Sequence, residues 1–126
     1  DIYEPGDHAS TFGGNPAACT AAKVVLNSLM KASILENVKK QGDYLKEKLN
    51  KLKERYEIII DVRGMGLMQG IELSLPVADI INQCIKSGLL LVGAGSQVIR
   101  FVPPLIVDKN EIDEAINILE NVLKEV

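Results

Sequence analysis

The chain has 126 residues, of which 47% are hydrophobic and 25% charged, and its formal net charge is −3. This length fits one domain, and the composition is that of a globular protein. The slightly acidic balance argues against nucleic acid as a partner, because nucleic-acid-binding surfaces are basic. No apolar run approaches the roughly 20 residues that a membrane-spanning helix requires, so no membrane partner is expected.

The first predicted element is a helix over residues 16–30. Asn15 stands at the favoured N-cap position, and Pro16 stands at the first helical position. The residues that follow are apolar on nearly all sides, which predicts a helix buried between two layers. In a small isolated domain, one side of such a helix would lack a cover.

A second helix is predicted to begin at Ser33, because Ser33 and Glu36 have the spacing of a capping box. Its apolar residues recur every three or four positions as far as Tyr56. Gly42 lies within this apolar stripe, which indicates close packing against a neighbouring element.

After Tyr56, the sequence pattern changes from that of a helix to that of strands. Residues 58–62 and 67–73 are rich in β-branched and apolar side chains, and the short turn between them predicts an antiparallel hairpin. A third helix is expected to start at Leu75-Pro76 and to end at Gly88. Two more short strands, over 89–92 and 97–102, complete the predicted sheet.

The final helix is predicted to open at a capping box formed by Asp108 and Glu111. Its segment, residues 108–126, carries two lysines and six acids, a balance of −4, whereas residues 31–55 carry eight basic residues and four acids, a balance of +4. These are interpreted as solvated helix faces that can lie near each other. The whole order predicts an α+β fold, with a small, largely antiparallel sheet covered by helices on one face.

Residues 10–16 read Ser-Thr-Phe-Gly-Gly-Asn-Pro and stand directly before the first helix. Hydroxyl groups, flexible glycines and the N–H groups of a helix start can together bind a phosphate. The alternative is an ordinary glycine-rich loop that is capped by Asn15.

Arg100 is the second candidate, because it lies in a predicted strand that has no polar face. Its guanidinium must pair with an acid such as Glu72, reach solvent, or bind an anionic ligand. A carboxylate is a suitable ligand, because the planar guanidinium offers two parallel N–H donors. Arg63 is a weaker candidate, for which a structural role is favoured.

No catalytic set is visible, and no metal site is expected. His8 is the only histidine and is interpreted as a loop residue. Cys19 and Cys84 are far apart in the sequence, which argues against zinc and against a disulfide framework and favours a reducing cytoplasmic setting.

Three motifs resemble those of the class III, pyridoxal-phosphate-dependent aminotransferases, most closely the acetylornithine and ornithine aminotransferases. They are HASTFGGNPAAC at residues 8–19, DVRGMGLMQGIEL at 61–73 and VIRFVPPLIV at 98–107. The resemblance covers essentially the whole chain. It implies the C-terminal small domain of a fold-type I enzyme at residues 15–126, preceded by a phosphate-contact loop at residues 1–14.

The resemblance also implies roles for single residues. Ser10 and Thr11 match positions that reach across a dimer interface to the phosphate of the neighbouring subunit's pyridoxal phosphate. Arg100 matches the arginine that binds the substrate's α-carboxylate. Ala9 departs slightly from the family, which often has glycine there.

The family's large domain, with its Schiff-base lysine, is missing from this sequence, so the isolated chain is expected to be inactive. The full-length protein is expected to be a cytoplasmic homodimer that moves an amino group between N-acetylornithine, or a similar ω-amine, and 2-oxoglutarate. The alternative is a free-standing α+β module that binds an anion or has a structural role without catalysis.

Overall fold

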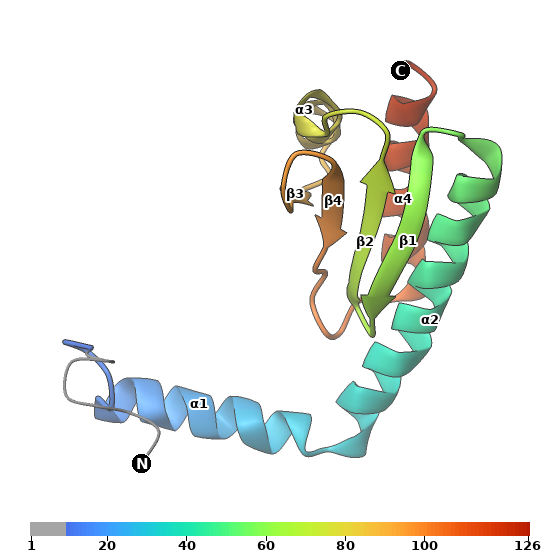
Figure 1. Ribbon diagram of the computed structural model, residues 1–126. Helices are drawn as coiled ribbons and strands as arrows, with labels where there is room; N and C mark the ends of the chain where they lie inside the picture. Colours follow the sequence, from blue (N-terminus) through green and yellow to red (C-terminus); the bar gives the residue numbers. More distant parts are fainter. Residues whose placement is uncertain (1–9) are drawn as a thin grey trace, which may run out of the picture.

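The computed structural model describes residues 10–126, and its elements follow the predicted order (Figure 1). The helices and strands are α1 (Pro16–Leu29), α2 (Ala32–Arg55), β1 (Ile59–Met65), β2 (Met68–Leu73), α3 (Ala78–Lys86), β3 (Val92–Gly93), β4 (Val98–Phe101) and α4 (Lys109–Leu123). The strands form one sheet in the order β1-β2-β4-β3, and every neighbouring pair is antiparallel. The predicted α+β fold is therefore confirmed.

The core lies between one face of the sheet and the helices behind it (Figure 1). Along β2, Ile71 and Leu73 are fully buried, while Glu72 between them lies on the opposite, open face. From the helices, Leu49 and Leu52 of α2 meet these strand residues in the same cluster. The alternation of the strands thus sends their apolar side chains inward and leaves a face without a helix.

The oppositely charged helices α2 and α4 are neighbours, as their charges predicted. Lys48 pairs with Asp113 at 2.8 Å, and Arg55 pairs with Glu120 at 2.6 Å. Asp113 also accepts hydrogen bonds from Tyr44 and Lys109, both at 2.6 Å. The hydrogen bond from Lys109, followed by those from Lys48 and Tyr44, holds the pKa of Asp113 well below its ordinary value.

The β1–β2 hairpin turns through Gly66 and Leu67, because β1 continues to Met65, beyond the predicted end of the strand at residue 62. Gly66 has a φ of +52°, which suits the first position of a two-residue hairpin turn. A Cβ atom on Gly42 of α2 would clash with the backbone of Gly66. The predicted close packing at Gly42 is therefore confirmed, and its partner is the hairpin turn.

Several predicted boundaries were wrong, among them the start of α3, which begins at Ala78 and not at Leu75-Pro76. Helix α2 begins before the expected capping box, with Lys31 at the N-cap and no side-chain cap, because Ile34 N–H already donates to the Lys31 carbonyl. Strand β3 is shorter than the predicted strand at residues 89–92. The N–H of Leu89 donates to the Cys84 carbonyl, so the chain there still completes the C-terminal cap of α3 around Gly88, whose φ is +92°.

Helix α4 opens as predicted, because Asp108 and Glu111 form both hydrogen bonds of a capping box. The segment before it is tied to α2 by Asn37, whose amide donates to the carbonyls of Leu105 and Val107 at 2.9 and 3.1 Å. The loop between β4 and α4 is thus anchored to a helix of the core.

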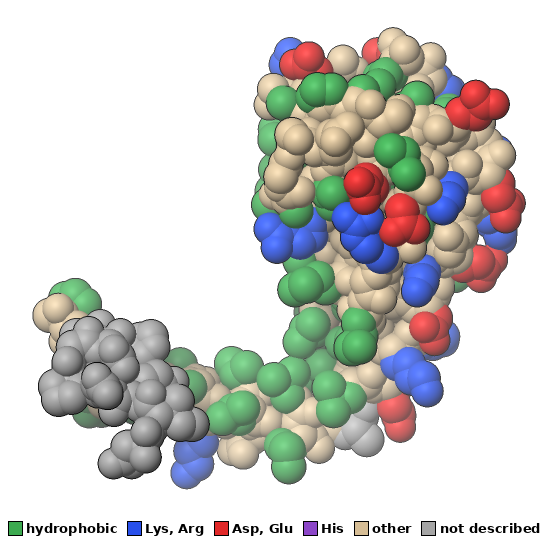
Figure 2. All heavy atoms as spheres, in the orientation of Figure 1, with side chains coloured by type: hydrophobic (Ala, Val, Ile, Leu, Met, Phe, Trp, Pro, Cys, Tyr) green, Lys and Arg blue, Asp and Glu red, His purple; other side chains and the backbone are tan. Residues whose placement is uncertain are grey.

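Helix α1 was predicted to be buried, and within this chain it is not. None of its residues is buried, and it lies apart from the sheet, meeting α2 at a bend of 69° (Figure 1). Figure 2 shows hydrophobic side chains along its surface. We call residues 10–31 the arm and residues 32–126 the body, because the arm's apolar face finds no cover in the body.

Candidate functional site

The loop at residues 10–15 forms a tight turn that leads into α1. Gly13 N–H donates to the Ser10 carbonyl at 3.4 Å, and a Cβ atom on Gly13 would come within 2.9 Å of the Ser10 Cβ. Gly14 has a φ of +75°, which side chains disfavour. The two glycines are therefore required by the loop's shape, and not only by its flexibility.

Asn15 ends this loop and starts the helix, as predicted. Its side-chain oxygen accepts from Ala18 N–H at 2.9 Å, and its amide nitrogen donates to the Phe12 carbonyl at 2.6 Å. Ser10 and Thr11 are exposed, and neither hydroxyl makes a hydrogen bond to another described residue. Within residues 10–126, both hydroxyls are therefore unpaired.

Arg100 lies on the open face of the sheet. Its neighbours in β4, Ile99 and Phe101, are buried on the core side. Directly across from Arg100 lie Gly70 of β2 and Val92 of β3. Gly70 has no side chain, and a Cβ atom there would lie 3.5 Å from Val98 Cγ1, so Val98 is the side chain nearest to this position.

Arg100 makes no ion pair or hydrogen bond with any residue in the described range 10–126. The alternative that it pairs with Glu72 is not observed, because Glu72 is already bound by Arg63. Arg63 Nη1 lies 2.5 Å from a Glu72 oxygen and 3.0 Å from an Asp61 oxygen. Arg63 therefore makes the ion pairs expected of a structural residue, and Figure 2 shows acidic and basic side chains side by side over the sheet.

The electrostatics of this group follow from the hydrogen bonds. The bond to Glu72, followed by that to Asp61, raises the pKa of the Arg63 guanidinium. The bond from Arg63 lowers the pKa of Asp61. Asp61 and Arg63 thus each favour the charged form of the other.

The structure does not bring the two sequence-predicted sites together. Ser10 and Thr11 lie at the far end of the arm, whereas Arg100 lies in the body (Figure 1). If Ser10, Thr11 and Arg100 belong to one site, residues of further polypeptide must lie between them in that site. His8 lies outside the described residues.

None of the chain's lysines is buried. Of the two cysteines, Cys19 is exposed, and burial raises the pKa of the Cys84 thiol, which makes it a poorer nucleophile. Within residues 10–126, no group of three or more His, Cys, Asp or Glu side chains could hold a metal ion. No single helix in this range is long and apolar enough to cross a membrane.

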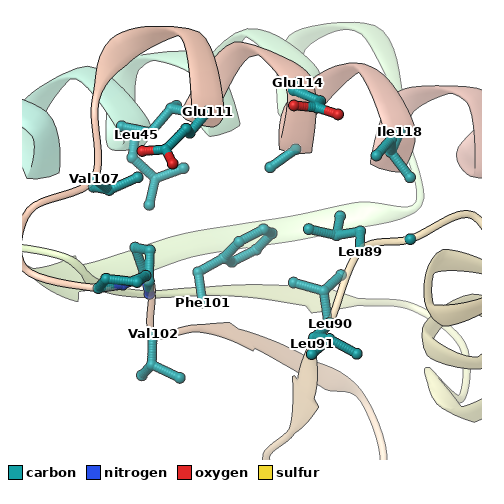
Figure 3. A pocket seen from close by; sticks show the side chains of 15 residues that line it. Leu45, Leu89, Leu90, Leu91, Phe101, Val102, Val107, Glu111, Glu114 and Ile118 are labelled. Atoms are coloured by element: carbon teal, nitrogen blue, oxygen red, sulfur yellow. The ribbon is translucent and has the colours of Figure 1, made fainter.

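One cavity was not anticipated from the sequence. A cleft of about 550 Å³ opens between α4 and the segments around Leu90 and Pro103. In Figure 3, Phe101 and Leu89 point into it from one side, and Ile118 of α4 points into it from the other. The apolar residues Leu89, Leu90 and Leu91 lie before β3 and not in the predicted strand, and they line one wall of this cleft.

The chain matches known proteins over nearly its whole length. Residues 1–123 match the family model of the class-III aminotransferases. The chain is 48% identical to an acetylornithine aminotransferase of Caldanaerobacter subterraneus over 126 residues, which are 99% of this chain and 32% of that protein.

Solved structures agree with this match. An ornithine aminotransferase of Plasmodium yoelii has a TM-score of 0.84 and 34% identity, and the alignment covers 98% of this chain and 33% of that one. A lysine aminotransferase of M. tuberculosis has a TM-score of 0.84 and 31% identity, with 96% and 28% covered. The chain thus spans about a third of the length of the relatives it matches.

Proposed function

Because the chain belongs to the class-III aminotransferase family, we propose that it is the C-terminal domain of an aminotransferase. The amino donor is N-acetylornithine or a similar ω-amine, and the acceptor is 2-oxoglutarate. Support comes from curated relatives named acetylornithine aminotransferase, and the structural relatives named for ornithine and lysine keep the donor class broad. Arginine biosynthesis in the cytoplasm is the setting that this activity suits.

The observation that carries the proposal is the unpaired guanidinium of Arg100. Arginine binds a carboxylate through two parallel N–H donors. Here these donors are not taken by a described residue, and the residue directly across from Arg100 on β2 is Gly70, which has no side chain of its own. We assign Arg100 to the α-carboxylate of the amino acid and of the 2-oxo acid.

Class-III aminotransferases use pyridoxal phosphate, which supplies the electron sink that amino-group transfer needs. The exposed hydroxyls of Ser10 and Thr11 fit a phosphate, and their position at the end of the arm suits a cofactor held by a second subunit. This part of the proposal requires a homodimer. It also divides the chain into a phosphate-contact loop at residues 1–14 and the C-terminal domain at residues 15–126.

A lysine that forms a Schiff base reacts as the neutral amine. Burial favours this neutral form, because it removes the water that stabilises the charged ammonium group. Since none of the lysines here is buried, we assign no catalytic residue to this chain. The large domain of the full-length enzyme would supply that lysine, and the 126-residue chain alone would be inactive.

The test is the substitution Arg100→Ala in the full-length enzyme that contains this chain. Loss of a charge-assisted pair should raise the KM for 2-oxoglutarate about tenfold to a hundredfold. Arg55→Ala is the matched control, because it removes an arginine whose partner, Glu120, lies away from the open face. An unchanged KM in Arg100→Ala would refute the carboxylate role.

The isolated chain provides the second arm of the test. With pyridoxal phosphate, N-acetylornithine and 2-oxoglutarate, it should give no turnover above a control that contains cofactor and substrates alone. Turnover above that control would show that the chain holds catalytic machinery that we have not assigned. A stable monomer that binds a carboxylate without any large domain would instead favour the free-standing module.

A further inference from the structure

Glu72 stands between two arginines on the open face of the sheet. In the register, Arg63 of β1 lies opposite Gly70, and so does Arg100 of β4. Glu72 is two residues further along β2, so it is a diagonal neighbour of both arginines. Diagonal neighbours on one sheet face lie about 7–8 Å apart, within reach of long side chains.

Glu72 pairs with Arg63 and leaves Arg100 without a partner. Arg63 is held on this side by a second acid, because Asp61 accepts from the same Nη1 nitrogen. A single guanidinium thus pairs with both acids, and it occupies the one carboxylate on β2 that could otherwise bind Arg100.

Without Arg63, the acids would face each other. Asp61 and Glu72 are directly opposite in the β1–β2 register, and like charges in that position repel. Lys53 lies 3.7 Å from Asp61 and would still neutralise that acid in part. Glu72 would then have no cation on the β1 side, and Arg100 on the β4 side would attract it.

We propose that Arg63 is a positioning residue for carboxylate recognition. By binding Glu72, it keeps Arg100 unpaired, so that an amino-acid or 2-oxo-acid carboxylate finds the guanidinium free. The inference rests on the proposed function, in which Arg100 binds that carboxylate. It adds that the unpaired state of Arg100 depends on the ion pair between Arg63 and Glu72.

The experiment measures KM and kcat for 2-oxoglutarate in the full-length enzyme. Arg63→Ala should raise KM about fivefold, the scale of one partly exposed ion pair, with a smaller change in kcat. The double variant Arg63→Ala/Glu72→Gln should return KM to within about twofold of the wild type, because the competing carboxylate is gone. Arg63→Lys should stay close to the wild type, since it keeps the charge.

The rescue separates this role from a merely structural one. If Arg63→Ala raises KM and Glu72→Gln does not lower it again, the inference is wrong. It is also wrong if Arg63→Ala leaves KM unchanged while Arg100→Ala raises it, and in that case the proposed function stands. Should Arg63→Ala fail to fold, Arg63→Gln removes the charge with less loss of side chain and makes the same prediction.

A second readout needs only the 126-residue chain. In a nuclear magnetic resonance titration with glutarate, the Arg100 Nε–H signal should move in the wild type. In Arg63→Ala it should start at a shifted position and move less, because Glu72 already occupies the guanidinium. Equal movement in both proteins would overturn the inference.

Discussion

The arm and the body are built from similar apolar side chains, but only the body buries them. In α1 of the arm, Leu26 is 62% exposed, whereas Leu49 in α2 of the body is 0% exposed. Both residues are leucines in helices with an apolar face. An apolar helix therefore indicates that some surface must pack against it. It does not indicate that the same chain provides that surface.

The two regions also differ in what they offer chemically. The arm ends in two exposed hydroxyls, Ser10 and Thr11, which suit a phosphate, and the body presents Arg100, which suits a carboxylate. Each region therefore carries one anion-binding element of the proposed site. The proposed homodimer would let an arm from one subunit act with a cofactor held by another.

The largest expected effect comes from matched leucine substitutions in the two regions. Leu49→Ala should lower the free energy of unfolding of the 126-residue chain by about 2–5 kcal/mol, because it leaves a cavity in the core. Leu26→Ala should change it by less than about 0.5 kcal/mol, as expected for a surface position. Urea denaturation followed by circular dichroism measures both.

The comparison would break if the two substitutions had equal effects. A cost for Leu26→Ala that grows with protein concentration would mean that the arms cover each other in solution. In the full-length enzyme the same substitution should become costly, since a cover for α1 would then be present.

A smaller effect is expected from the helix caps. Asp108→Ala removes a complete capping box from α4 and should cost about 1 kcal/mol in the unfolding of the body. Asn15→Ala removes the equivalent cap from α1 and should loosen the first turn of α1 without moving the unfolding midpoint. A shift of that midpoint in Asn15→Ala would show that the arm and the body unfold together.

The smallest effect concerns acid pH. Asp113 has a pKa below its ordinary value of 3.8, because Lys109, Lys48 and Tyr44 hydrogen-bond to its carboxylate. Its contribution to stability is therefore complete above about pH 4 and is lost as the pH falls further through the lowered value. Asp113→Asn should make Tm less dependent on pH in this acid range, and a dependence equal to that of the wild type would contradict this role.

Much of the body could be predicted from local patterns. The β1–β2 hairpin, the Asp108–Glu111 capping box and the glycine at the end of α3 each have a signal within a few residues. The capping-box pattern at Ser33 was equally clear and was wrong, because Ile34 N–H bonds to Lys31 and starts the helix earlier. Local signals therefore predict that an element exists more reliably than where it begins.

The candidate site was predictable only in part. Arg100 was identified because a charged residue stood in an apolar strand, but the sequence left open whether Glu72 pairs with it. In the structure Glu72 binds Arg63 instead, and the register of three strands makes Glu72 a diagonal neighbour of both arginines. Such pairing across strands has no signal in the sequence of any one strand.

The strand order has a consequence for how the chain folds. Strands β1 and β2 are neighbours in sequence and need only a two-residue turn to pair. Strand β4, which carries Arg100, pairs with β2 only after residues 74–97 have been closed into a loop that contains α3 and β3. Because closing a longer loop has a larger entropic cost, we expect the hairpin to form early and the strand that carries Arg100 to join it late.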